Sequence, residues 1–158
     1  MKLHKRLALV IITITLLVFM SGCIIIPLSK YYVFSAEEVT SVQFYDLRSL
    51  DSGNKSGFDK ICDPVFTLPE ADKKVFLDDF SKIKFSDTII IMIAAIDPSF
   101  SYGDWVVRID FSNGQYTFYS SAGYGETFDA EGNFVSSTHY SCDDAALEQL
   151  ISEYYEIP

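Results

Sequence analysis

The segment from Trp105 to Ser120 most constrains the fold of this 158-residue chain. Its first part, WVVRIDF, alternates along the chain from Trp105 to Phe111 with the period of two that is typical of a half-buried β-strand. Asn113-Gly114 follows, a pair that is favoured in two-residue type I′ hairpin turns. The residues from Tyr116 onward carry the returning strand, so the segment predicts an antiparallel β-hairpin.

Five other segments carry strand signals, which are β-branched and aromatic residues bounded by turn residues. They are Val39–Leu47, with Val42 and Phe44 on one face; a short strand at 64–67; the continuously apolar stretch Thr88–Ile96; and a second hairpin formed by 126–129 and 134–140. The apolar stretch is too short to span a membrane and is rich in Ile, so we expect a central strand buried on both faces. Residues 51–57 read as a loop.

Two segments predict amphipathic helices. Thr67-Leu-Pro-Glu70 matches a capping box and starts a helix that runs to about Ile83, with an apolar side made by Phe76, Phe80 and Ile83. The last helix follows a cap at 141–144, and its apolar stripe is Leu147, Leu150, Ile151 and Tyr154. The expected fold is α+β: a mostly antiparallel sheet with two amphipathic helices packed on one face.

The amino terminus carries an export signal. Lys2, Lys5 and Arg6 precede an apolar run from Leu7 to Met20, and small residues follow at 21 and 22. A basic head, a short apolar run and small residues together are typical of a secretory signal peptide. A transmembrane helix usually needs about 20 apolar residues, which is more than this run contains if it ends at Ser21.

Met20-Ser21-Gly22-Cys23 resembles the lipobox of bacterial prolipoproteins. The resemblance implies cleavage before Cys23 and a diacylglycerol on its sulfur. The expected organisation is a signal peptide at 1–22, a lipid-anchored tether at 23–36 and one globular domain at 37–158. Two alternatives stay open: an uncleaved anchor from Leu7 to Leu28, and free secretion. Each of the three places the domain outside the cytoplasm, and the favoured one places it on the cell membrane.

The charge of the chain excludes one class of partner. The full chain has a formal net charge of −10, and removal of the signal leaves nine Lys and Arg against 22 Asp and Glu, a net charge of −13. A domain with this much negative charge is expected to repel nucleic acid, and the sequence has no basic patch that would offset the repulsion. With ten Tyr and thirteen Phe the chain can still build a substantial core.

Cys62 and Cys142 are the cysteines left when Cys23 carries lipid. Outside the cytoplasm they could form a disulfide, which would close a long loop and stabilise the domain by about 4–5 kcal/mol. The alternative is two buried thiols. A further alternative is a reactive Cys142, because it lies near the expected start of a helix.

The sequence offers little for catalysis. His139 is the sole histidine of the mature body, and zinc sites need three or four suitable ligands. The oxygen-rich loops 51–54 and 129–133 do not match a calcium-binding loop, and ordinary turns explain both. We therefore expect a non-enzyme without a cofactor or metal. A small hydrolase that uses His139 with a serine or carboxylate remains the catalytic alternative.

The expected function is a binding or interaction domain of the cell envelope, with a protein or glycan partner. Phe100 and Tyr102 would be contact residues if 97–103 is a hairpin tip; the alternative is that both rings fold back onto the sheet. The aromatic run Tyr116, Phe118, Tyr119 and Tyr124 is either a ligand platform or core. No pocket of ligand size with converging polar groups is expected. The other candidate function is an immunity or enzyme-inhibitor lipoprotein, since acidic surfaces attract basic partners.

Overall fold

The computed structural model describes residues 24–51, 55–60, 62–91, 102–122, 125–138, 140 and 142–157. The chain divides into two compact units. The first comprises 1–27 and 88–98, and its described residues are the first four of strand β1 (Ile24–Lys30) and the last four of strand β4 (Phe85–Ile91). The second comprises 28–87 and 99–158 and holds all the other described elements. The signal peptide and Cys23 lie outside the described residues.

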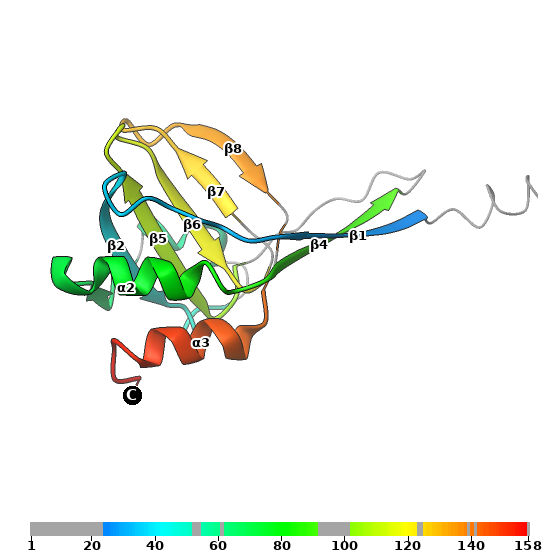
Figure 1. Cartoon of the computed structure of the whole chain (residues 1–158). Coiled ribbons are helices and arrows are strands. Elements are labelled where there is room, and N and C mark those ends of the chain that lie inside the picture. The colour runs from blue at the N-terminus through cyan, green and yellow to red at the C-terminus, as the bar shows by residue number, and fades with distance from the viewer. Residues whose placement is uncertain are drawn as a thin grey trace, which may run out of the picture. The chain divides into compact units, whose positions relative to one another are not determined.

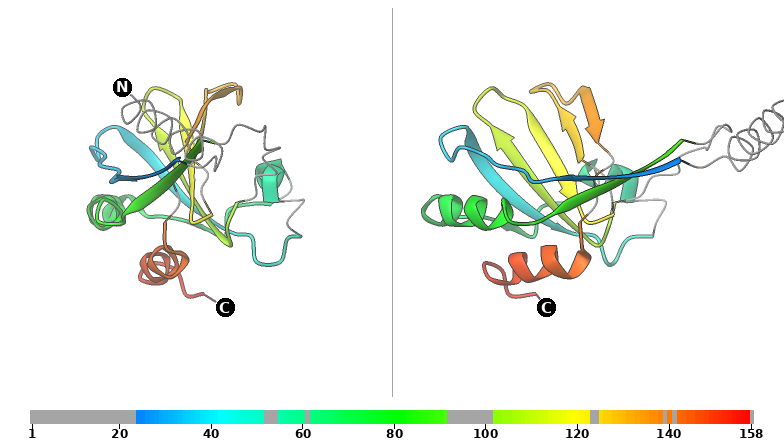
Figure 2. Two further views of the ribbon diagram at one scale, coloured as in Figure 1. Left: turned by 90° about the vertical axis from the view of Figure 1, so that its right-hand side faces the viewer. Right: turned by 45° about the vertical axis from the view of Figure 1, so that its right-hand side comes forward.

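The second unit is built on a six-stranded antiparallel sheet (Figure 1). Its strands in spatial order are β3 (Phe66–Thr67), β2 (Val39–Asp46), β5 (Trp105–Phe111), β6 (Tyr116–Ser120), β7 (Gly125–Phe128) and β8 (Phe134–Thr138). Strands β5 to β8 follow one another as hairpins, and the right-hand view of Figure 2 shows them side by side. The mostly antiparallel α+β class and the strands expected near 39–47, 64–67, 105–111 and 126–140 are confirmed.

The turn between β5 and β6 differs from the predicted type. Type I′ turns require positive φ at two residues, but here Gly114 alone has one, at 86°. Its N–H donates to the Phe111 carbonyl oxygen at 2.9 Å, and the Phe111 N–H donates to the Gln115 oxygen at 2.8 Å. This is a three-residue loop, a tight turn followed by a left-handed glycine. The predicted hairpin is confirmed. The predicted turn type is wrong, because the loop has three residues instead of the two of a type I′ turn.

The described part of the apolar stretch Thr88–Ile96, residues 88–91, is not a central strand of the main sheet. Its first residues belong to β4, which pairs with β1 in a separate two-stranded sheet, and residues 92–96 lie outside the described part. Continuous apolar sequence predicts burial but does not specify the neighbouring strand.

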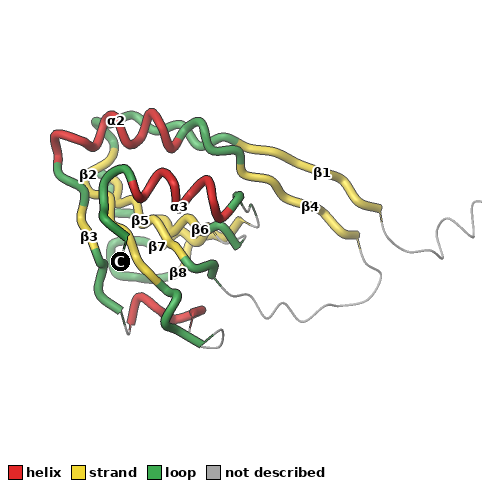
Figure 3. Tube along the Cα trace, turned by 90° about the horizontal axis from the view of Figure 1, so that it is seen from below, coloured by secondary structure: helices red, strands yellow, loops and turns green. Residues whose placement is uncertain are grey.

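The helices are α2 (Glu70–Phe80) and α3 (Asp144–Ser152). The predicted capping box of α2 is wrong: Pro69 is the N-cap residue, no side chain caps the helix, and Thr67 pairs with Gln43 in the sheet. Helix α3 is capped by Asp143, whose carboxylate accepts from the Ala145 N–H at 3.0 Å. Both predicted apolar sides contribute buried residues. Figure 3 shows α2 and α3 as neighbours, and Phe76 of α2 meets Tyr154 at 5.5 Å between ring centroids.

The two helices have fewer residues than a membrane span needs. Helix α2 has 11 residues and α3 has nine, and among the described residues no helix is long and apolar enough to cross a bilayer.

Two groups of buried side chains lie on the sheet. The first core contains Val42, Phe44, Trp105, Val107, Ile109 and Tyr119 of the sheet together with Phe76, Leu77, Phe80, Leu147, Leu150 and Ile151 of the helices. The second core contains Tyr45, Val106 and Phe118 of the sheet with Leu47, Tyr102 and Phe58, the last from the 3₁₀ helix η1 (Lys55–Lys60). Because alternate residues of β5 enter different cores, the cores lie on opposite faces of the sheet.

The globular body begins earlier than the predicted boundary at residue 37. Tyr32 is 8 % exposed and belongs to the first core, with Phe34 packed against it. The Tyr32 ring lies 4.7 Å from that of Tyr119 and 5.0 Å from that of Phe85. Burial of the Tyr32 and Phe34 rings stabilises the fold. The second half of the tether that the sequence predicted at 23–36 is therefore part of the folded domain.

Candidate ligand-binding face

The face of the sheet that carries the second core also carries two rows of aromatic and polar side chains, most of them partly exposed. Cross-strand partners point to the same side, so the register defines their members. One ladder row is Gln43, Arg108, Phe118 and Glu126; the next is Asp110, Tyr116, Phe128 and Phe134. We call these eight residues the aromatic face. Phe134, at the edge strand β8, is 58 % exposed.

Arg108 is stacked on the aromatic face. Its guanidinium carbon lies 3.9 Å from the ring centroid of Tyr116, and its Nε and Nη2 donate to Asp110 Oδ1 at 2.9 and 2.7 Å. Burial raises the pKa of the Tyr116 hydroxyl, and the neighbouring Arg108 charge opposes that rise. Tyr116 in turn stacks on Phe128, with ring centroids 5.2 Å apart and planes 17° apart. The aromatic face therefore already binds one planar cation from its own chain.

Beside this stack the described residues line a hollow of about 290 Å³. Its residues are Asp59, Lys60, Tyr102, Phe118, Glu126, Phe128, Gly132 and Phe134. Phe118 and Tyr102 are buried, at 1 % and 4 % exposure, whereas Phe128 is half-buried. The hollow thus has a closed aromatic floor, and exposed Phe134 stands at its open side.

Polar groups of different elements converge on this hollow. The Tyr102 hydroxyl donates to Glu126 Oε2, which connects the segment before β5 to β7. Asp59 and Lys60 come from the end of η1 and are exposed. Helix η1 is held by Phe58, whose ring lies 4.9 Å from that of Phe118 and 5.0 Å from that of Tyr102. The hollow combines ring faces, two carboxylates and an ammonium group.

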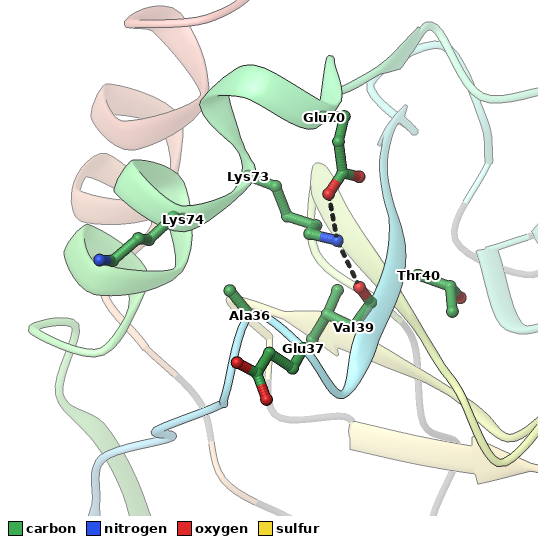
Figure 4. A pocket seen from close by; sticks show the side chains of 7 residues that line it. All are labelled: Ala36, Glu37, Val39, Thr40, Glu70, Lys73 and Lys74. Atoms are coloured by element: carbon green, nitrogen blue, oxygen red, sulfur yellow. Dashed lines mark hydrogen bonds and ion pairs between the residues drawn. The ribbon is translucent and has the colours of Figure 1, made fainter.

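A second hollow, of about 520 Å³, lies between the start of α2 and the turn that enters β2 (Figure 4). At its centre Lys73 Nζ donates to the Val39 carbonyl oxygen at 2.6 Å and pairs with Glu70 Oε1 at 2.8 Å. The Lys73 side chain is 11 % exposed, while Lys74 is exposed and points away from it. Val39 stands at a register shift of β2, so Lys73 completes the hydrogen bonding of an irregular strand. Its ammonium is engaged in the fold, which disfavours this groove as a ligand site.

The volumes of these two hollows correct one prediction. Ligand pockets in proteins usually measure about 300–1,000 Å³. The groove at Lys73 falls within this range and the aromatic hollow lies close to its lower end. The groove at Lys73 thus has the volume of a ligand pocket, contrary to the expectation of no pocket of ligand size with converging polar groups, although its ammonium group is engaged by the fold.

The predicted contact residues have different outcomes. Tyr102 is not an exposed anchor, because its ring packs between Phe58 and Phe118, at 5.0 and 6.1 Å between centroids. For this residue the alternative, folding back onto the sheet, is what the structure shows. Phe100 lies outside the described residues, as do Cys23 and His139.

The predicted aromatic platform is divided between the two faces. Tyr116 and Phe118 lie on the aromatic face, Tyr119 enters the first core, and Tyr124 lies outside the described residues. Sequence reasoning missed Phe128, Phe134 and Glu126. Alternation along the predicted hairpin could have identified Phe128 and Phe134 as cross-strand partners.

In the structure Cys62 and Cys142 are two half-buried free thiols and do not form a disulfide with each other. Burial raises the pKa of the Cys142 thiol to about 12, and the nearby carboxylates of Asp144 and Asp143 add to the rise. Thiolates are the reactive form of cysteine, so the burial of this thiol disfavours a reactive Cys142.

The loop at 129–133 is an ordinary turn. Asp129 Oδ2 accepts from the Asn133 side-chain amide at 3.0 Å, and Asp129 Oδ1 accepts from the N–H groups of Asn133 and Glu131 at 2.7 and 3.1 Å. The side-chain hydrogen bond from Asn133 is the main cause of the lowered pKa of the Asp129 carboxyl, and its backbone N–H adds to the effect. In the part of the chain that the structure describes, no group of three or more His, Cys, Asp or Glu side chains could hold a metal ion.

Comparisons with protein families, curated proteins and solved structures found no match to this chain.

Proposed function

We propose that the chain is a lipid-anchored, non-catalytic binding domain of the cell envelope that faces outside the cytoplasm. The lipobox at Cys23 supports the anchoring, as argued above. The aromatic face supports the binding role, because it offers ring surface, paired charges and a hollow on one side of a sheet. Aromatic and arginine side chains are enriched in the centres of binding surfaces. The partner class is a protein or glycan of the envelope.

We also infer that α2 and α3 cover one face of the main sheet and leave the other for binding. Residues of both helices share a core with Val107 and Ile109 of β5. On the opposite face, the second core is smaller and has η1 as its cover. The part of this face that η1 does not cover, which includes the partly exposed rings of Tyr116, Phe128 and Phe134, would then be available to a partner.

Photocrosslinking in the native cell tests the binding role. A photoreactive phenylalanine replaces Phe134 on the aromatic face, and a matched control replaces Val75, which is 57 % exposed on α2. Illumination is expected to yield an adduct with an envelope protein or glycan from position 134 and none from position 75. Equal labelling from both positions, or none from 134, contradicts a binding role for this face.

The alternative function is an immunity or inhibitor protein for a basic partner. The net charge of −10 favours it, because an acidic surface speeds association with a basic protein. Under this alternative, a pull-down recovers one basic protein, and association weakens steeply as salt screens the charges. A neutral or acidic partner, or association that salt does not change, contradicts it.

A further inference from the structure

We propose that the hollow at Phe128 and Phe134 binds the head of a small organic monocation, an alkylammonium or guanidinium group. This inference rests on the proposed function, because it assigns a ligand class to the same aromatic face.

The arrangement of the rings is the first argument. Neighbouring rings of the hollow stand at steep angles to one another: Phe118 and Phe128 at 67°, Phe128 and Phe134 at 81°, Tyr102 and Phe118 at 85°. Their centroids are 5.7, 6.2 and 6.1 Å apart. The partly exposed rings of Phe128 and Phe134 are nearly perpendicular to each other, so they offer a ring face and a ring edge to a ligand, whereas Phe118 and Tyr102 are almost fully buried. The faces carry the negative part of the ring quadrupole, which attracts cations and is the basis of aromatic cages for quaternary ammonium groups.

The charges of the lining are the second argument. Glu126 and Asp59 bring carboxylates from β7 and η1, against one lysine, Lys60. The hydrogen bond from the Tyr102 hydroxyl fixes the Glu126 carboxylate at the wall. Lys60 is exposed at the end of η1, where its long side chain can reach into solvent. The lining is therefore acidic, and the field of a chain with net charge −10 concentrates cations near it.

The neighbouring stack is the third argument. One strand position away, the face already holds the Arg108 guanidinium 3.9 Å from the Tyr116 ring, and Tyr116 stacks on Phe128. The hollow repeats the same chemistry, rings with carboxylates. Lys60 belongs to its lining and Arg108 lies 5.9 Å from the Phe118 ring centroid, but among the described residues no cation lies over the rings of Phe128 and Phe134. An anion would meet two carboxylates here. A purely apolar ligand would remove water from those carboxylates and give no compensation.

Calorimetric titration of the full-length chain in an uncharged maltoside detergent tests the proposal. The probes are choline, N-acetyl-arginine amide and 3,3-dimethylbutan-1-ol, which has the shape of choline with a carbon in place of the charged nitrogen. At least one cation is expected to bind saturably, and about tenfold more tightly than the neutral alcohol. Preference for choline points to a free quaternary ammonium compound as the source, and preference for the arginine probe points to a side chain of a protein partner.

Two substitutions locate the site, and two others serve as matched controls. Phe134→Leu and Glu126→Gln are each expected to weaken cation binding about three- to tenfold. Phe134 is 58 % exposed, and a glutamine oxygen can still accept from Tyr102, so both variants keep the fold. Tyr31→Leu and Glu148→Gln remove an exposed aromatic ring and an exposed carboxylate outside the hollow and should leave affinity unchanged. Unchanged melting temperatures verify folding.

Three results overturn the proposal: no saturable binding of either cation, equal affinity for the neutral alcohol, or equal losses in the hollow and control variants. Crosslinking from position 134 that persists without cation binding means that the cation assignment alone is wrong. Cation binding without crosslinking in the cell means that the proposed envelope function is wrong while the ligand class stands.

Discussion

The guanidinium of Arg108 lies 3.9 Å from the ring centroid of Tyr116 and is held there by Asp110, two residues along the same strand. Arg108 is therefore both a planar cation on a ring and the partner of a carboxylate. Because Tyr116 also stacks on Phe128, the stacked groups extend continuously from β5 across β6 to β7.

Replacement of Arg108 by lysine keeps the charge but removes the planar stacking and the two-nitrogen contact with Asp110. We expect the free energy of unfolding to fall by about 1 kcal/mol. Urea denaturation followed by Trp105 fluorescence measures it, since Trp105 lies in the first core. Arg48→Lys is the comparison: its guanidinium carbon lies farther from a ring, 5.0 Å from the Trp105 centroid, and its pair with Asp46 is more exposed, so a smaller effect is expected. Equal effects would show that the closer stacking on Tyr116 contributes no more than the looser stacking of Arg48 on Trp105.

Lys73→Met tests the link between α2 and β2. Methionine keeps the apolar stem but leaves the Val39 carbonyl without the donor that Lys73 supplies at 2.6 Å. Loss of a partner for a buried carbonyl should lower the free energy of unfolding by about 1–2 kcal/mol. The neighbouring exposed lysine gives a matched control, Lys74→Met, for which a change within about 0.5 kcal/mol is expected. Chemical denaturation compares both, and a K73M variant as stable as K74M contradicts the role.

Cys142 should behave as a protected thiol. Its pKa of about 12 keeps it protonated near neutral pH, so alkylation in the native state should be much slower than in urea. Mass spectrometry of alkylated peptides measures both rates, and fast native labelling of Cys142 would refute its burial.

The raised pKa of Cys142 also predicts a pH dependence of stability. The folded value, about 12, lies above the ordinary 9.0, so the stabilising contribution is full below pH 9 and is lost between about pH 9 and 12. Tyrosines titrate in the same window, so the test compares the wild type with Cys142→Ala. The stability difference between the two should shrink as pH rises through this window. A difference that stays constant contradicts the assigned pKa.

Gly114 should tolerate asparagine better than alanine. Its φ of 86° lies in the left-handed region, where a side chain costs about 1–2 kcal/mol and where asparagine is better accommodated than most residues. Gly114→Ala is expected to lower the free energy of unfolding by about 1 kcal/mol, and Gly114→Asn by less. Equilibrium denaturation distinguishes them, and the reverse order would contradict the turn geometry.

Strands and apolar helix faces were predictable because they depend on local periodicity. Val42 and Phe44 share a face of β2, and Leu147, Leu150 and Ile151 form the buried side of α3, as expected. The predicted capping box does not form because Thr67 pairs with Gln43 in the sheet. This tertiary interaction outweighs the local signal for a helix start.

The candidate site was less predictable because distant segments build it. Phe58, Tyr102 and Phe118 come together from η1, the segment before β5 and β6, and no periodicity connects η1 to that sheet face. The same packing buries Tyr102. The prediction that 97–103 forms an exposed hairpin tip did not take this packing into account. Sequence reasoning had named Tyr116 and Phe118 as candidate platform residues, and the pair Phe128 and Phe134, opposite each other in one hairpin, was also within its reach.

Mass spectrometry of the chain purified from native membranes tests the proposed anchoring most directly. The expected amino-terminal peptide begins at Cys23 and carries a diacylglycerol on the sulfur, and Cys23→Ala should abolish that modification. An intact chain in the cytosol that retains Met1 and an unmodified Cys23 would contradict an envelope function for this protein.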